Sequence, residues 1–238
     1  MDENRYHRQT ILPEIGEEGQ RKMSVASVLC IGAGGLGCSA LLYLAAAGIG
    51  HIGIVDFDAV DESNLQRQIL YKQDQIGQNK AQAAKDNLLA LNDTIKITAF
   101  PERLNAGNIE KLLTGFDMIF DGSDNFATKF LVNDAGVKFG KPVIYASILG
   151  FDGQVSVFDT KCGSSCYRCL FPKPPTHNIP NCAEAGVIGA LAGIVGTTQA
   201  MEAIKMIVDH KSLKPLIGKL WTIDARTCLL YTSPSPRD

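Results

Sequence analysis

The sequence lacks the features that mark a nucleic-acid-binding, secreted or membrane-spanning protein. Its 23 Lys and Arg residues are outnumbered by 25 Asp and Glu residues, and a net charge of −2 provides no basic field for a nucleic acid. The first ten residues, MDENRYHRQT, are polar and charged and do not resemble a secretory signal. The apolar stretches 40–50 and 186–196 are far shorter than the roughly 20 residues of a membrane helix. We therefore expect neither nucleic acid nor membrane as a partner.

Cysteine is scarce as well. Seven cysteines among 238 residues are too few and too unevenly spaced for a disulfide framework, which favours a cytoplasmic protein with reduced thiols. Cys30 and Cys38 fall within apolar segments and are most simply core residues. Four others crowd into one segment and need a separate explanation: Cys162, Cys166, Cys169 and Cys182.

What the sequence does contain is an alternation of strands and helices. Strands are predicted over 27–32, 51–58, 94–100, 116–124 and 142–148, and helices over 35–48, 77–91, 106–113 and 126–140. This alternation predicts an α/β, Rossmann-like fold with a mostly parallel sheet, helices on both faces and ligands at the carboxyl edge. After residue 150 the pattern changes to antiparallel strands, at 153–159 and 218–225, around a Cys- and Pro-rich loop (161–183) and a long helix (184–208).

No internal repeat divides the chain, and 45% hydrophobic residues suffice for one substantial core. We predict a single domain over 1–228, with a nucleotide-binding half at 24–148 and a second half at 149–228. The last ten residues, LLYTSPSPRD (229–238), have no periodicity and are expected to be an unstructured or artefactual tail.

The hexapeptide GAGGLG (32–37) follows a predicted strand and opens a helix. Gly32 permits the tight turn, Gly34 lets the backbone approach a phosphate, and Gly37 allows close packing of helix on strand. The helix N-terminus then offers unpaired N–H groups to an anion. Asp56 lies 19 residues beyond Gly37, at the end of the next strand, where a carboxylate bonds ribose hydroxyls. The combination predicts a nucleotide site without distinguishing NAD from ATP.

Cationic and amide side chains follow this ribose-binding acid. Arg67 and Lys80 come shortly after Asp56, and Asn64 and Gln68 add amide groups. Arginine offers forked donors to phosphate, and lysine offers a point charge. Each cation alone is typical of a solvated helix face. Because a hydride-transfer site needs no cations near the phosphates, their grouping favours a triphosphate.

The segment DGSDN (121–125) ends the fourth predicted strand at the same edge of the sheet. Asp121 and Asp124 are both suited to cap the helix that follows. A carboxylate beside a triphosphate is also a suitable ligand for magnesium, which is typically held by one or two carboxylates plus phosphates. We expect Asp124 to bind Mg²⁺.

Seven motifs occur in an order that resembles the MoeB/ThiF family, bacterial relatives of ubiquitin-activating enzymes that adenylate small ubiquitin-like sulfur carriers. The resemblance covers about residues 5–227 and is far more specific than a lone glycine motif. The motifs are RYHRQ (5–9), GAGGLG (32–37), DFDAVDESNLQRQ (56–68), Lys80, DGSDN (121–125), CYRCLFP (166–172) and NCAEAGVIG (181–189).

The resemblance implies an ATP-dependent adenylyltransferase. The carrier's C-terminal glycine carboxylate attacks the α-phosphate of ATP and gives a carrier acyl-adenylate and pyrophosphate. Two unit negative charges about 4 Å apart repel by roughly 4 kcal/mol at an effective dielectric near 20, so fixed cations are needed. No general base is needed, because a carboxylate is ionised at neutral pH. The residues expected to act on the reacting groups are Arg67, Lys80, Asp124 and Arg8. Those expected to contact ATP are Gly32, Gly34, Gly35, Gly37, Asp56, Ser63, Asn64, Arg67, Gln68, Lys80, Asp124 and Asn125.

A homodimer and a zinc site are further implications of the resemblance. The family arginine that matches Arg8 reaches the neighbouring subunit's ATP site. Cys166 and Cys169 match one C-x-x-C pair of a structural zinc site, which needs four ligands. The family's second pair would lie beyond Thr227, where this chain has only Cys228. Zinc is therefore expected of the intact protein, and two reduced loop thiols suit this chain equally well.

The remaining cysteines of the segment allow different roles. Cys182 aligns with a family cysteine that forms a thioester or acyl-disulfide with the activated carrier, although adenylation does not require it. It precedes the predicted helix at 184–208, whose N-terminal dipole lowers a thiol pKa. Cys162 and Cys228 would raise the zinc ligands to four, but their spacing is not that of a zinc site.

Several functions stay open on the sequence. CYRCLFP (166–172) and TTQAMEAIK (197–205) favour a carrier of the molybdopterin-synthase small-subunit type over the thiamine-pathway carrier. A relative acting on tRNA is disfavoured because no basic cluster is present. The glycine loop and Asp56 alone also suit an NAD-dependent dehydrogenase, and a truncated chain would suit a non-catalytic carrier-binding scaffold.

Overall fold

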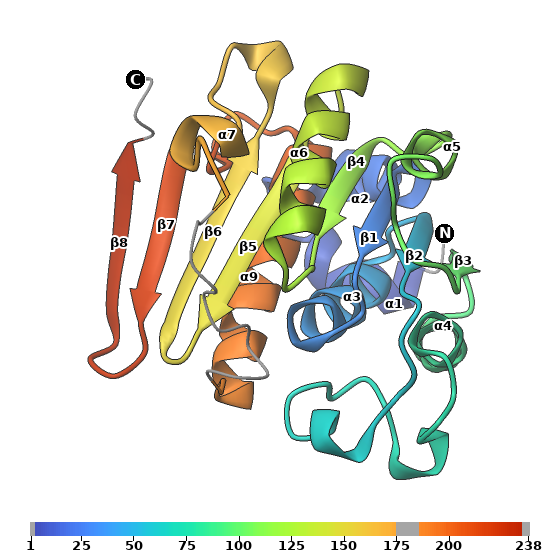
Figure 1. Ribbon diagram of the computed structural model, residues 1–238. Coiled ribbons are helices and arrows are strands. Elements are labelled where there is room, and N and C mark those ends of the chain that lie inside the picture. Colours follow the sequence, from blue (N-terminus) through green and yellow to red (C-terminus); the bar gives the residue numbers. More distant parts are fainter. Residues whose placement is uncertain (1–2, 175–185, 235–238) are drawn as a thin grey trace.

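The computed structural model describes residues 3–174 and 186–234, which build one eight-stranded sheet flanked by helices (Figure 1). The strand order is β3-β2-β1-β4-β5-β6-β7-β8. The strands are β1 (Ser27–Ile31), β2 (His51–Val55), β3 (Lys96–Phe100), β4 (Met118–Asp121), β5 (Val143–Leu149), β6 (Asp152–Phe158), β7 (Lys219–Asp224) and β8 (Leu229–Pro234).

The sheet is parallel from β3 to β5 and antiparallel from β5 to β8. Strand order reverses at β1, which pairs with β2 on one side and with β4 on the other. Ligands of open α/β sheets bind beyond the carboxyl ends of the strands at such a reversal. The Rossmann-like parallel half and the antiparallel extension predicted from the sequence are both confirmed.

Helices cover both faces of the sheet. The α-helices are α1 (Glu3–Thr10), α2 (Gly16–Val25), α3 (Gly35–Ala47), α4 (Lys80–Leu91), α5 (Ile109–Leu113), α6 (Phe126–Phe139), α7 (Tyr167–Leu170) and α9 (Gly189–Val208). Three 3-10 turns lie at η1 (Glu62–Asn64), η2 (Gln73–Gln75) and η3 (Thr160–Cys162). Side chains of α3, α4 and α9 pack on one face of the sheet, and those of α5 and α6 pack on the other.

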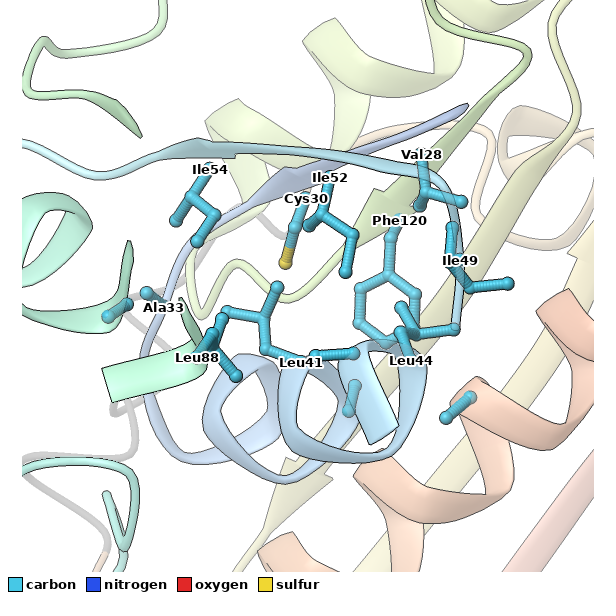
Figure 2. Close-up of a cluster of buried hydrophobic side chains, with 14 of the residues drawn as sticks. Val28, Cys30, Ala33, Leu41, Leu44, Ile49, Ile52, Ile54, Leu88 and Phe120 are labelled. Carbon is cyan, nitrogen blue, oxygen red and sulfur yellow. The ribbon is translucent and has the colours of Figure 1, made fainter. Parts of the chain in front are cut away.

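Strand β1 shows how the sequence builds this core. All five residues of SVLCI are buried, because a central parallel strand is covered on both faces. Val28 and Cys30 join the cluster formed with α3 and α4, while Leu29 and Ile31 join the cluster formed with α5 and α6. Figure 2 shows the first of these clusters, in which Cys30 is surrounded by aliphatic side chains. Burial raises the pKa of the Cys38 thiol to about 12, as befits the structural cysteine expected from the sequence.

Several element boundaries differ from the predicted ones. Helix α4 begins at Lys80 rather than residue 77, because the side chain of Asn79 accepts a hydrogen bond from the Gln82 N–H and caps the helix there. Helices α1 and α2 were not predicted, since they are short and their sequences are mostly polar. Helix α9 is described from Gly189 onward, and residues 175–185 lie outside the described part of the chain.

Of the two alternatives expected for the tail, an unstructured one is wrong for residues 229–234. They form β8, which pairs with β7 in six antiparallel residue pairs from Lys219–Pro234 to Asp224–Leu229. The alternation of a half-buried strand is missing because every β8 residue is exposed, so no apolar face marks the segment in the sequence.

Helix α9 is the one described helix that is long and apolar enough to cross a membrane, by length and composition alone. Half of its apolar window is buried within the fold, against α3 and strands β5 and β6. It also carries the buried polar residues Gln199 and Glu202. These contacts are typical of a core helix, and a core helix can be as long and as apolar as a membrane-spanning one.

Helix α1 is held to the body of the fold by the side chains of Arg5, Tyr6 and Gln9. The Tyr6 hydroxyl accepts a hydrogen bond from the Asn92 amide (2.9 Å), and its ring covers Gly48, where a Cβ would come within 2.6 Å of it. The Gln9 amide donates to the Gln20 side chain and to the Ala47 carbonyl. Helix α1 is therefore docked at both turns.

Candidate functional site

A cavity of about 400 Å³ opens beyond the carboxyl ends of β1, β2, β4 and β5. Its position is the reversal point of the sheet, where the sequence predicts a nucleotide. Nine of the residues predicted to contact ATP line it: Gly32, Gly34, Gly35, Asp56, Arg67, Gln68, Lys80, Asp124 and Asn125. The motifs that lie far apart in the sequence are thus brought together around one space.

The glycine loop fits its predicted roles. Gly32 has φ +90°, a conformation that side chains disfavour, and turns the chain out of β1. A Cβ at Gly37 would overlap the Gly32 carbonyl oxygen, so this glycine serves packing and does not line the cavity. Gly34 and Gly35 do line it, at the start of α3. This leaves main-chain N–H groups at a helix N-terminus facing the cavity, as phosphate binding requires.

Asp56 follows β2 and is only 9% exposed. One carboxylate oxygen accepts a hydrogen bond from the Ala33 N–H (2.8 Å), and the other accepts from the Asp58 N–H (2.9 Å). Burial raises the pKa of Asp56, and the two backbone hydrogen bonds oppose that rise only in part. The carboxylate is therefore locked in orientation, with lone pairs left for ribose hydroxyls.

The raised pKa of Asp56 gives a pH prediction. As pH falls through this pKa the carboxylate is protonated and loses acceptor capacity, so ATP affinity should decline at higher pH than for an ordinary aspartate, whose pKa is 3.8. Protonation also relieves a buried charge, so this group's contribution to stability is greatest in acid and is lost as pH rises through the raised pKa. Calorimetric ATP titrations across pH should be made on wild type and on Asp56→Asn. The nucleotide's own protonation affects both proteins equally, so the additional loss of affinity in wild type at low pH reports on Asp56.

Two cations occupy the wall next to Asp56. The Lys80 side chain is 7% exposed, and its Nζ lies 3.3 Å from Asp58 Oδ2. Arg67 donates from Nη1 to the Ser63 carbonyl (3.1 Å), and its aliphatic stem lies beside Gly35. Lys80 is thus paired with a carboxylate and Arg67 with a carbonyl oxygen. Both side chains also line the cavity, where a triphosphate would offer them further hydrogen-bond acceptors.

Of the polar residues between β2 and α4 that were predicted to contact ATP, some line the cavity and others do not. Gln68 is buried and lines the cavity, and its Oε1 has no hydrogen-bond partner among the described residues. Ser63 and Asn64 are not on the cavity wall, and Asn64 instead donates to the Ser63 hydroxyl. Their predicted contact with ATP stays a prediction.

Asp121 and Asp124, which were both expected to be suited to helix capping, have different surroundings in the loop after β4. Asp121 is buried and paired with Lys129, while Asp124 is exposed at the cavity. Neither caps α6, since the side chain of Asn125 accepts from the Thr128 N–H (2.9 Å). One carboxylate at a site for a triphosphate suits magnesium, which completes its coordination with phosphate and water oxygens.

Sequence reasoning missed an aromatic contact at the cavity. Phe57 is 47% exposed, and the Arg103 guanidinium lies 3.8 Å from the centre of its ring. Both residues line the cavity at the ends of β2 and β3. Phe57 stands in the opening DFD of a motif that the sequence analysis used only for its acids, whereas Arg103 belongs to no motif. A flat cationic and aromatic surface of this kind suits a nucleobase.

The other predicted site residues lie elsewhere. Arg8 is exposed on α1 and does not line this cavity. Cys182 lies outside the described residues. The Sγ atoms of Cys166 and Cys169 are 3.5 Å apart, but no third His, Cys, Asp or Glu joins them within the described ranges 3–174 and 186–234. Within the described residues these two thiols make up half of a four-ligand set, and neither Cys162 nor Cys228 joins them, so the zinc site stays a prediction.

Comparison with known proteins agrees with this geometry. The sequence model described as ThiF family matches residues 6–236. The chain is 49% identical over 227 residues to a sulfur carrier protein adenylyltransferase of Thermus thermophilus, covering 93% of this chain and 83% of that protein. It is 47% identical to a probable adenylyltransferase/sulfurtransferase MoeZ of Mycobacterium tuberculosis, covering 97% of this chain and 61% of MoeZ. For an adenylyltransferase and sulfurtransferase MOCS3 of Culex quinquefasciatus, identity is 45% and the shares are 92% and 50%.

Solved structures share the fold at lower identity. E. coli MccB with ATP superposes with a TM-score of 0.84 at 23% identity, over 98% of this chain and 72% of that one. PaaA superposes with a TM-score of 0.80 at 24% identity, over 98% and 73%. These likenesses bear on architecture alone. Matched by the family's sequence model over nearly its whole length and 49% identical to a curated relative, the chain belongs to the ThiF family.

Proposed function

We propose that this protein uses ATP to adenylate the C-terminal glycine of a ubiquitin-like sulfur carrier protein of the molybdopterin-synthase small-subunit type. Adenylyltransferase activity follows from kinship, since a relative 49% identical is named a sulfur carrier protein adenylyltransferase. The chain spans only 61% of MoeZ and half of MOCS3, whose names add a sulfurtransferase activity that is not proposed here.

The observation that carries the proposal is the grouping of charge around the cavity. Lys80 and Arg67 stand on the wall shared with Asp56, and Asp124 stands beyond the end of β4. A nucleotide whose ribose is bound by Asp56 would place its phosphates near the glycine loop and these cations. Their charge offsets the repulsion between an incoming carboxylate and the triphosphate, which would otherwise be several kcal/mol.

Each side chain has one task in this scheme. Arg67 donates forked hydrogen bonds to phosphate oxygens, and Lys80 adds a positive charge held in place by Asp58. Asp124 would hold magnesium, which supplies further charge neutralisation when bound. The carrier's carboxylate attacks the α-phosphorus as the bond to the pyrophosphate oxygen breaks, and no proton moves.

The type of carrier rests on sequence alone. CYRCLFP (166–172) and TTQAMEAIK (197–205) support the molybdopterin type, and the thiamine-pathway carrier is the alternative. Each purified carrier should be incubated with the protein, ATP and Mg²⁺, and its mass measured for an added AMP. Adenylate on the molybdopterin-type carrier, with a higher kcat/KM in pyrophosphate exchange, is the expected result.

Other outcomes would replace the proposal. Preference for the thiamine-type carrier would change the substrate and keep the reaction. Thermal protection by NAD, with none by ATP and Mg²⁺, would indicate a dehydrogenase. Carrier binding without any pyrophosphate exchange would indicate a scaffold.

We also propose a homodimer in which Arg8 completes the partner's site. Arg8 is exposed on a helix that Tyr6 and Gln9 fix to the body, and it does not line its own chain's cavity. A rigidly held arginine on the surface is suited to act on a second copy.

A heterodimer made by co-expressing Arg8→Ala and Asp124→Ala chains with different tags tests this proposal. If Arg8 acts on the partner's site, one of the heterodimer's two sites has both Asp124 and an Arg8 from the other chain. The heterodimer should therefore have about half of wild-type exchange activity, while each mutant homodimer is nearly inactive. An inactive heterodimer would place Arg8 in its own chain's site, and a monomeric wild-type protein in light scattering would remove the dimer altogether.

A further inference from the structure

A buried polar network lies behind the loop that carries Asp124. Lys129, on the first turns of α6, is 5% exposed, and its Nζ donates to Asp121 Oδ2 (3.2 Å) and to the Ala146 carbonyl (2.7 Å). The same Nζ lies 5.0 Å from the centre of the Tyr145 ring. The cation is therefore enclosed on all sides by β4, β5 and its own helix.

Stability alone does not account for this pair. A buried ion pair typically contributes no more to folding than apolar residues of the same volume would. Three neighbouring buried positions of α6 are apolar, Phe130, Val132 and Ala135, and the polar one, Asn133, accepts a hydrogen bond from the Tyr167 N–H. A methionine or leucine at position 129 would continue that packing. A lysine there calls for a role beyond the core.

The network holds the main chain at the edge of the cavity. Asp121 Oδ1 accepts hydrogen bonds from the Ser123 N–H (3.0 Å) and hydroxyl (2.5 Å). On its other side the loop meets the glycine loop, since a Cβ at Gly122 or at Gly32 would come within 2.9 Å of the other's carbonyl oxygen. From α9, Gln199 donates to the Asp121 carbonyl (2.9 Å). The residue after this fixed turn is Asp124.

We propose that Lys129 is a positioning residue for the nucleotide site. By holding Asp121 it fixes the turn that presents Asp124. By neutralising Asp121 it also keeps an uncompensated negative charge away from the phosphates. The proposal rests on the proposed function in one respect, that ATP binds in this cavity. Lys129 itself does not line the cavity.

The test measures ATP and adenosine binding by calorimetry in the presence of Mg²⁺. Lys129→Met should weaken ATP binding by roughly tenfold, the scale of one uncompensated charge near an anion. Adenosine has no phosphates, so its affinity should be unchanged, whereas a collapsed site would lose both ligands. The double variant Lys129→Met with Asp121→Asn should recover most ATP affinity, because the asparagine oxygen still accepts from Ser123 and carries no charge.

Lys205→Met is the matched control. Lys205 pairs with the buried Glu202 on α9, and neither residue lines the cavity, so this variant should bind ATP as wild type does. Unchanged ATP affinity in a folded Lys129→Met variant would overturn the proposal. If that variant does not fold, ATP binding by the double variant is measured in its place. Retained ATP binding supports the proposed role of the Asp121 charge. Loss of ATP binding with adenosine binding intact overturns that role. A wild-type protein that binds no ATP would instead contradict the proposed function itself.

Discussion

Arg67→Ala should lower carrier-dependent ATP–pyrophosphate exchange by about 10³-fold, the range found when a preorganised donor to a transferring phosphoryl group is removed. The arginine reaches the cavity from the segment between β2 and α4, and its stem lies against Gly35 of the glycine loop. Alanine removes both the charge and the fork of donors. Arg67→Lys keeps the charge alone and should give an intermediate rate.

The fold should survive this change. Arg67 is only partly buried, and the one hydrogen bond that its side chain makes within the described part of the chain, to the Ser63 carbonyl, contributes about 1 kcal/mol to the free energy of unfolding. Arg21→Ala is the matched control, because Arg21 is an exposed arginine paired with Glu18 on α2, away from the cavity. Wild-type exchange in folded Arg67→Ala would remove Arg67 from the chemistry.

Asp124→Ala should also lower exchange by about 10²- to 10³-fold, since magnesium would lose the carboxylate proposed to hold it. The defect should be partly relieved by raising the Mg²⁺ concentration, because phosphate and water oxygens can still bind the ion. Initial rates measured across a Mg²⁺ titration would show a shifted midpoint.

The side chain is exposed, so the free energy of unfolding should change by no more than about 0.5 kcal/mol. Asp86→Ala offers the comparison, because Asp86 is exposed on α4 and outside the cavity. An unshifted Mg²⁺ midpoint together with a wild-type rate would show that Asp124 binds no ion that matters to the reaction.

The parallel half of the fold was predictable because its signals are local. Strands β1, β2, β4 and β5 are short, mostly buried apolar runs bounded by glycine, aspartate or proline, and the glycine loop fixes the order of the first strand and helix. The N-terminal helices were not predictable in this way. Helix α1 is held by Tyr6 and Gln9 through partners at Asn92, Gln20 and Ala47, and contacts with such distant residues cannot be read from a short polar segment.

Some residues of the candidate site were likewise predictable from the sequence, and others were not. Asp56, Arg67 and Lys80 follow one another in the chain, so their grouping was visible before the structure. The difference between Asp121 and Asp124 was not, because it depends on a lysine eight residues further on that turns inward. Arg103 was missed for the same reason, since it meets Phe57 only when β2 and β3 lie side by side.

The contact between Gly32 and Gly122 has a consequence for how this protein can vary. Where the two loops meet there is main chain on both sides, and the spacing at that point is set by peptide groups alone. Substitutions among the neighbouring core residues can therefore leave this spacing unchanged. A methyl group at either glycine would instead force apart the ends of β1 and β4 and widen the cavity where the phosphates of a nucleotide are proposed to lie.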